Sequence, residues 1–266
     1  DRAILFGAET VEFWPSTQDS DLPFAPLPGA TFSVGIKGTG LATLFNRSFA
    51  WVTNYNEVCI GDPDNIISEP ELQVRIEDST NSSLWTFYVD NNEFLAIRLD
   101  DETWVYGARS KVWSKFESHN QPNWIPQCYD SGYFGSSVDG KLLAWSDDYS
   151  DFDGPVVRSF RAWTPLTEQV LKLASVILRA NTGATPYLTG SYANPTVELR
   201  TSRDGGKEWQ PWKSRSLGQQ GQYRTKVIWS TLGQFSFPGA LVEVRVTDPV
   251  PFRVSNLSYN EKLGGR

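Results

Sequence analysis

The chain has 266 residues, of which 39% are hydrophobic, 14% aromatic and 21% charged, and its formal net charge is −7 at pH 7. This composition is that of a globular protein with a sizeable core, which excludes a largely disordered chain. The net negative charge argues against a protein that binds nucleic acid by neutralising its phosphates, because that mode of binding needs a basic surface. No apolar run approaches the ~18 residues of a membrane span, so no membrane-spanning segment is expected.

The sequence offers little of the chemistry on which most enzymes depend. His119 is the only histidine, so any Ser-His-Asp triad would have to use it, and a site with several histidine ligands cannot be built. It lies in a polar run, residues 117–122, that is typical of an exposed loop. Cys59 and Cys128 match no metal-binding spacing, and we expect both to be free thiols. We therefore expect no cofactor, no metal and no catalytic residues.

The first 165 residues carry a weak internal repeat. Alanine recurs within similar apolar fragments at positions 3, 50, 96 and 144, which gives spacings of 47, 46 and 48 residues. A period of roughly 40 to 50 residues made of short strands is typical of β-propeller blades. Because the chain contains no methionine and begins at Asp1 in the middle of the repeat pattern, we expect a further part of the protein to lie upstream.

Within each repeat, short apolar segments alternate with residues that favour turns. Asn46-Arg47, Asp90-Asn91-Asn92 and Asp139-Gly140 each separate two such segments, as in an antiparallel β-hairpin. The predicted strands are 41–45, 49–53, 58–60, 85–89, 94–97, 103–106, 132–138 and 142–145.

Two irregular segments and one acidic run interrupt this pattern. Residues 15–28 contain four prolines and predict an exposed excursion that is available for a partner. Residues 120–127 predict a second loop, pinned by its tryptophan and proline. The acidic run 147–154 predicts a solubilising turn, because a calcium loop needs a glutamate about six residues after its glycine and Phe160 stands there.

The pattern of apolar and polar residues changes after residue 165. Residues 170–178 form a long apolar run without a polar face, which predicts a strand buried on both sides, with a short helix as the alternative. Further strands are predicted at 196–200, 212–214, 223–229, 241–246 and 252–257, before a frayed tail at 262–266. The predicted fold is all-β, with propeller-like blades at 1–165. A β block at 166–266 either closes the blades or forms a small β domain.

A loop in the C-terminal block carries the pattern S-x-D-x-G-x-x-W, known as an Asp box. Its residues are Ser202, Asp204, Gly206 and Trp209. Glycine beside aspartate allows the positive φ angles of a tight turn, and the serine and aspartate side chains can bond to turn amides. We expect the tryptophan to fold back over the hairpin. The motif therefore predicts a structural role and no chemistry.

Several blocks occur in a fixed order along the chain. They are 3–7, 11–14, 23–30, 103–107 with Trp113, 204–209, 212–218, 222–229, 232–233 and 245–250. In this order they closely resemble the packaged-DNA stabilisation proteins of short-tailed bacteriophages, also called tail hub or nozzle proteins. The likeness covers most of the chain, although members of that family usually begin well upstream of this point.

The resemblance implies a structural protein of the virion tail, assembled in the host cytoplasm and built on a β-propeller. It implies that copies form a ring, sixfold in the relatives, below the portal and adaptor proteins. Such a ring continues the DNA channel, retains packaged DNA and supports fibres, spikes or a plug during genome ejection. DNA would pass through it without specific binding, and the resemblance implies no catalytic residues.

Two other functions stay open at this point. A sialidase-like glycosidase also carries Asp boxes, and it needs an arginine cluster, a tyrosine nucleophile and an acid. The candidates for these roles are Arg47, Arg75, Arg98, Arg158, Arg161 and Tyr133. Nothing in their positions along the sequence places them near one another. A carbohydrate- or receptor-binding module would instead stack exposed tryptophan and tyrosine side chains on sugars.

Overall fold

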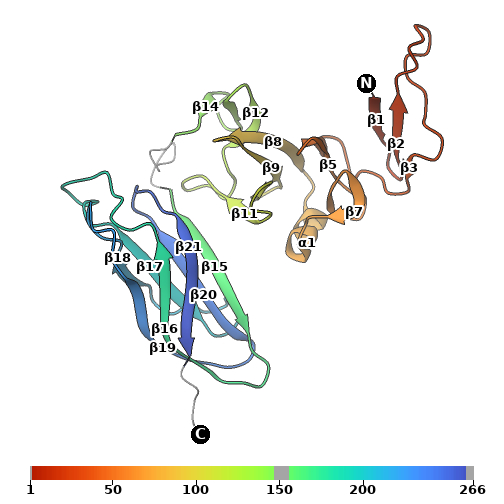
Figure 1. Cartoon of the computed structure of the whole chain (residues 1–266). Coiled ribbons are helices and arrows are strands. Elements are labelled where there is room, and N and C mark those ends of the chain that lie inside the picture. The colour runs from red at the N-terminus through yellow and green to blue at the C-terminus, as the bar shows by residue number, and fades with distance from the viewer. Residues whose placement is uncertain (1, 147–155, 262–266) are drawn as a thin grey trace. The chain divides into compact units, whose positions relative to one another are not determined.

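The computed structural model describes residues 2–146 and 156–261, and it divides into two compact units, unit 1 (Asp1–Trp145) and unit 2 (Ser146–Arg266) (Figure 1). The expected boundary after residue 165 falls inside unit 2. It falls there because β15 (Arg158–Pro165) pairs along its whole length with β20 (Gly239–Val246). The acidic run 147–154 and the tail 262–266 lie outside the described residues.

Unit 1 consists of antiparallel sheets in which each strand pairs with its neighbours along the chain, as in propeller blades. The first sheet contains β1 (Arg2–Phe6), β2 (Val11–Pro15) and β3 (Thr31–Phe32), and the second β4 (Ala42–Phe45), β5 (Ser48–Val52), β6 (Val58–Ile60) and β7 (Asp62–Ile66). The third contains β8 (Ser83–Val89), β9 (Asn92–Arg98), β10 (Thr103–Gly107) and β11 (Trp113–Phe116), and the fourth β12 (Pro126–Asp130), β13 (Tyr133–Ser136) and β14 (Leu142–Ala144). The strands predicted between residues 41 and 145 are confirmed.

Two tight turns explain why these hairpins could be recognised. Both central residues have positive φ in the β4–β5 turn (50° at Asn46, 61° at Arg47) and in the β8–β9 turn (48° at Asp90, 58° at Asn91). Two-residue turns of this kind match the twist of paired strands, and asparagine and aspartate tolerate them well.

Buried side chains fill the spaces between successive sheets of unit 1. Trp51 lies in a cluster between the first and second sheets, and Phe45 and Trp104 lie in one between the second and third. Between the third and fourth sheets, Trp124 stacks on Trp85 with ring centroids 5.8 Å apart. Trp124 belongs to the loop at 120–127, so the expectation that this loop is pinned by its tryptophan is confirmed.

The alanine repeat holds for only part of its length. Ala50 in β5 and Ala96 in β9 are fully buried in the second strand of their sheets, whereas Ala144 is exposed at the end of the third strand of its own. The connection from β7 to β8 includes a helix, α1 (Pro70–Asp78), and is longer than the connection from β11 to β12. The sheets begin at residues 2, 42, 83 and 126, which are 40, 41 and 43 residues apart, so the alanine spacing of 46 to 48 residues is longer than the sheet spacing and the alanine moves from the first strand of its sheet to the third.

Helix α1 was not predicted from the sequence. Pro70 stands at its first turn, where a proline costs no hydrogen bond, and Leu72 and Ile76 share one face and are completely buried. They join the cluster between the second and third sheets. A helix of nine residues is marginal by itself, so this burial stabilises it.

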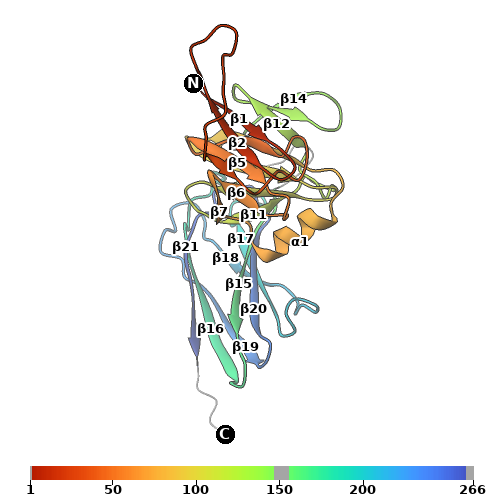
Figure 2. The same ribbon diagram turned by 90° about the vertical axis from the view of Figure 1, so that its right-hand side faces the viewer.

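Unit 2 is a β-sandwich and therefore a separate β domain. One sheet has the strand order β15-β20-β17-β18, in which β17 is Thr196–Ser202 and β18 is Lys213–Ser216. The other sheet has the strand order β19-β16-β21, in which β16 is Leu171–Ala180, β19 is Val227–Phe235 and β21 is Val254–Glu261. The strands run along the length of the unit in both views (Figures 1 and 2). Residues 223–226, expected to be extended, precede β19.

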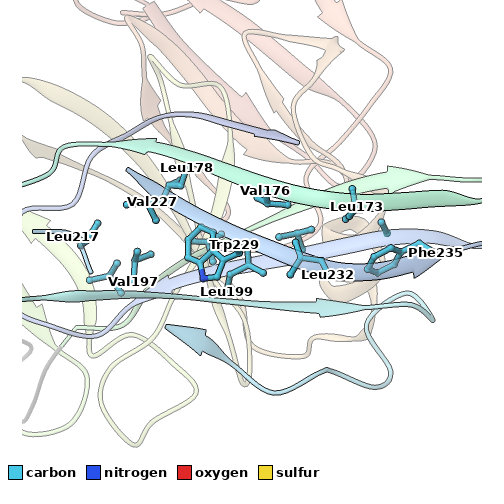
Figure 3. Close-up of a cluster of buried hydrophobic side chains, with 14 of the residues drawn as sticks. Leu173, Val176, Leu178, Val197, Leu199, Leu217, Val227, Trp229, Leu232 and Phe235 are labelled. Atoms are coloured by element: carbon cyan, nitrogen blue, oxygen red, sulfur yellow. The ribbon is translucent and has the colours of Figure 1, made fainter. Parts of the chain in front are cut away.

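The expectation that residues 170–178 are buried on both sides was wrong. Leu171, Leu173, Val176 and Leu178 are buried in the core between the sheets, close to Trp229, while Lys172 is exposed (Figure 3). A bulge between Leu173 and Ser175 shifts the alternation by one residue. This shift is why the sequence shows no clean polar face.

Candidate functional site: the Asp-box loop

The Asp box begins at Ser202, the last residue of β17, continues into the loop between β17 and β18, and is held by hydrogen bonds among its own residues. The Ser202 hydroxyl donates to Asp204 Oδ1 at 2.7 Å and accepts from the Gly206 amide at 2.9 Å. The Glu208 amide donates to the Asp204 carboxylate, with 3.0 Å to each oxygen. The φ angles of Gly205 and Gly206 are 77° and 98°, values that residues with a side chain rarely adopt.

These hydrogen bonds stabilise the ionised form of the aspartate. The Glu208 amide, followed by the Ser202 hydroxyl, lowers the pKa of Asp204 below its ordinary value. The carboxylate uses its oxygens on the loop itself, and that arrangement suits a turn.

The tryptophan of the motif belongs to a stack of arginine and tryptophan side chains, which we call the Arg–Trp stack. Trp209 lies beside the guanidinium carbons of Arg161 and Arg200, 5.3 and 4.3 Å from its ring centroid. Trp212 lies between Arg200 and Arg245, at 4.4 and 3.9 Å. Guanidinium groups are attracted to the faces of indole rings, so the stack fixes the second half of the loop, residues 209–212, against the sheet.

Two glutamates neutralise the arginines of this stack. Glu243 on β20 lies opposite Arg161 and Arg200 in register and pairs with both, with 3.2 Å from Arg161 Nε to Oε1. Glu198 accepts from Arg245 Nε at 2.8 Å. Only 6% of Glu243 is exposed, a degree of burial that an acid tolerates when it is paired.

A small hollow lies beside the loop, where pairing between β17 and β18 ends. Its volume is about 270 Å³; Leu199 and Leu232 contribute apolar surface to it, and Arg203 and Lys213 contribute charge. Arg203 lies 5.6 Å from the Phe235 ring, and Lys213 Nζ donates to the Thr231 carbonyl at 3.3 Å.

Four of the arginines named for a glycosidase have different partners. Arg75 pairs with Glu102 (Nε to Oε1, 3.6 Å), Arg98 donates to the Trp124 carbonyl, Arg158 donates to the carbonyls of Asp248 and Val250, and Arg161 pairs with Glu243. Arg47 occupies the β4–β5 turn, and Tyr133 is exposed on β13. These residues therefore lie on separate elements.

The structure also places the histidine and the two cysteines that the sequence analysis named. His119 is exposed, and both cysteines are free, Cys59 buried and Cys128 exposed. Among residues 2–146 and 156–261, no group of three or more metal-ligating side chains comes together, and no helix is long and apolar enough to cross a membrane.

The Arg–Trp stack is the feature that the sequence analysis missed. Charged residues alternate with apolar ones at Glu198 and Arg200 on β17 and at Glu243 and Arg245 on β20, so an outward-facing charged side was visible in the pattern. Which charge faces which depends on register, and that comes only from the folded chain.

Comparison with protein families matches both units. Residues 1–137 match the family model described as "Bacteriophage P22 Gp10, beta-propeller", and residues 159–261 match "Bacteriophage P22 Gp10, beta-sandwich". A search of individual curated proteins found no match. The expected propeller and the expected phage function are confirmed, and the glycosidase interpretation is set aside, since this is a family of structural proteins. The chain belongs to the bacteriophage P22 Gp10 family of phage stabilisation proteins, which are components of the virion tail that retain packaged DNA.

Proposed function

We propose that copies of the chain form a closed ring, six in number, below the portal and adaptor proteins of the tail. In this position the ring continues the DNA channel. The observation that carries the proposal is that both units match one family of tail proteins that retain DNA. A ring of identical copies needs head-to-tail contacts, in which one surface of a copy meets a different surface of the next.

The charge of the chain supports passage of DNA without specific binding. A net charge of −7 disfavours tight binding of phosphates by the chain as a whole, which supports a channel that does not trap DNA by counterion release. The ring then retains packaged DNA because it blocks the exit together with other tail proteins. This does not require tight binding of the duplex.

The excursion between β2 and β3 is suited to contact such a neighbour, whether portal, adaptor, fibre, spike or plug. It stands away from its sheet in both views (Figures 1 and 2), with Leu22 57% and Leu27 48% exposed. It is also held in place, since the Leu27 amide donates to the Phe13 carbonyl at 2.9 Å and the Thr17 amide to the Pro23 carbonyl at 3.0 Å. A loop that is already ordered loses less entropy on binding.

We further propose that the Asp box, Ser202, Asp204, Gly206 and Trp209, serves only to hold its loop. The hydrogen bonds within the motif and the Arg–Trp stack support this role, because they occupy its polar groups and its indole ring.

The ring is tested by light scattering on the purified chain after size exclusion, combined with electron microscopy of the particles. We expect a particle of six copies with a central channel, and no tight or sequence-specific binding of duplex DNA in fluorescence anisotropy. A chain that stays monomeric at every concentration tested would contradict the proposal.

A further inference from the structure

The charge of the chain is divided unequally between its two units. Unit 1 contains 20 Asp and Glu residues against 9 Lys and Arg, a net charge of −11, whereas unit 2 contains 15 Lys and Arg against 11 Asp and Glu, a net charge of +4. The positive charge of unit 2 lies at its surface, since the exposed residues between 156 and 260 include ten Lys or Arg and only two Asp or Glu. An acidic chain therefore carries a basic surface on its sandwich.

Three of these exposed cations lie along β19, and we call them the basic row. Arg215 and Lys213 belong to β18, and Arg203 directly follows β17. Their contacts advance along β19: Arg215 Nε donates to the Ile228 carbonyl at 2.8 Å, Lys213 Nζ donates to the Thr231 carbonyl at 3.3 Å, and Arg203 lies 5.6 Å from the aromatic ring at the end of the strand. These contacts position the three side chains without neutralising them.

No acid neutralises the basic row in the part of the chain that the structure describes. Arg161, Arg200 and Arg245, on the other strands of the same sheet, each pair with a glutamate, whereas the three members of the row pair with none. Residues 209–242 contain no Asp or Glu, and the Asp204 carboxylate bonds to its own loop. The row therefore keeps its positive charge available for an anionic partner.

The hollow beside the Asp-box loop lies between two members of the row. Arg203 and Lys213 line it, together with apolar surface from the buried Leu199 and Leu232, and its volume is about 270 Å³. A carboxylate side chain combines an anionic group with an apolar stem, so it can meet both kinds of lining at once. Arginine in particular binds carboxylates through charge-assisted hydrogen bonds.

Two classes of anion are at hand in a tail, the phosphates of DNA and the carboxylates of proteins. A duplex binds through an extended set of phosphate contacts, and the apolar part of this hollow gives a phosphate no favourable contact. A hollow of this size, part apolar and part cationic, suits a single acidic side chain. The geometry therefore favours a carboxylate on a protein.

The division of charge selects which protein surface supplies it. In a closed ring each copy presents one surface to a different surface of the next copy. Contact of unit 1 with unit 1 would place like charges together, which is costly, whereas contact of unit 2 with unit 1 places opposite charges together. We infer that the basic row is one half of the contact between neighbouring copies, and that its hollow receives a carboxylate side chain from unit 1 of the next copy. This inference rests on the proposed ring.

The test is sedimentation velocity over a concentration series at several salt concentrations, with the whole chain and three single variants. Arg203→Glu and Lys213→Glu reverse a charge at the hollow. Arg253→Glu is the matched control, because it makes the same change at an exposed position of unit 2 directly before β21, which β16 separates from β19. Thermal unfolding checks that each variant keeps its fold, as expected for exposed positions. Fluorescence anisotropy with a labelled DNA duplex is recorded on the same samples.

We expect assembly of the wild type to weaken as salt is raised, because salt screens the charges that meet at the contact. Both hollow variants should need concentrations about tenfold or more above that of the wild type to assemble, with the control unaffected. Duplex DNA should not distinguish the hollow variants from the control.

The inference alone is overturned if the wild type assembles and the hollow variants assemble equally well, if the control is affected as much as they are, or if salt leaves assembly unchanged. Loss of duplex binding in the hollow variants, with assembly intact, would assign the row to DNA and overturn it. A changed sedimentation coefficient of the monomer, with assembly intact, would place the contact inside one copy and also overturn it. A wild type that stays monomeric at every salt concentration overturns the proposed ring, and the inference with it.

Discussion

The two units bury their apolar side chains in different ways. In unit 1 the buried side chains fall into three clusters among the described residues, one in each space between successive sheets. In unit 2 a single cluster fills the space between two long sheets. A blade cannot bury both of its faces alone, so each sheet of unit 1 depends on its neighbours, whereas the two halves of the sandwich depend on one shared core.

Tryptophan shows the same contrast on a smaller scale. Trp51, Trp85 and Trp124 are buried between sheets of unit 1, where they contribute apolar area. Trp209 and Trp212 lie on the outer face of a sheet in unit 2, against arginines. Tryptophan can do both because it combines a large apolar ring with an electron-rich face.

The largest effect that separates the units is expected from core tryptophans. Trp229→Ala should destabilise unit 2 by about 3–5 kcal/mol and reduce hydrogen-exchange protection in both of its sheets, because they share one core. Trp51→Ala should cost a similar amount, but the loss of protection should concentrate in β1 to β7 and spare β12 to β14. Exchange measured by mass spectrometry distinguishes these patterns. A uniform loss across unit 1 would show that its sheets do not unfold separately.

The next largest effect is expected at the buried acid of the Arg–Trp stack. Glu243→Gln leaves Arg161 and Arg200 without their countercharge, and we expect a loss of about 1–2 kcal/mol, since both arginines remain partly exposed. Denaturant unfolding measures it. Glu208→Gln, on an exposed position of the same loop, is the control and should change stability little. Equal effects of the two variants would mean that net charge, and not pairing in the stack, is responsible.

A smaller effect is expected from the Asp box itself. Asp204→Ala removes the acceptor of the Glu208 amide and of the Ser202 hydroxyl, which should lower stability less than Glu243→Gln does and loosen residues 203–212 without unfolding the core. Exchange of the loop amides and the assembly state are the readouts. Lys207→Ala, at an exposed position, should leave both unchanged. Unaltered loop protection in Asp204→Ala would contradict the structural role.

The smallest effect on stability is expected when the pH is lowered and Asp204 becomes protonated. Because the pKa of Asp204 is lowered in the folded chain, its contribution is fully present above the ordinary aspartate pKa of about 4 and is lost as pH falls through the lower folded value. Carboxyl chemical shifts measured by NMR should show this titration below that of a model aspartate, and Asp204→Asn should remove it. A normal titration midpoint would mean that the loop bonds do not form in solution.

The sequence was most informative where structure is local. Hairpins with two positive φ angles, such as Asn46-Arg47, and the Asp-box turn depend on residues within a few positions of one another, so their patterns could be recognised. Helix α1 was missed although Pro70, Leu72 and Ile76 carried its signal. The bulge in β16 concealed the alternation that would have shown one buried face.

By itself the sequence determined the all-β class, the position of most hairpins, the Asp-box loop and the resemblance to tail proteins, because short-range conformational preferences and ordered sequence blocks can be read along the chain. Only the tertiary structure decided that β15 belongs to the sandwich, that Glu243 faces two arginines, and that Arg203 and Leu232 line one hollow. These three features join residues distant in sequence, and pairing over such distances is set by register and packing of the whole fold.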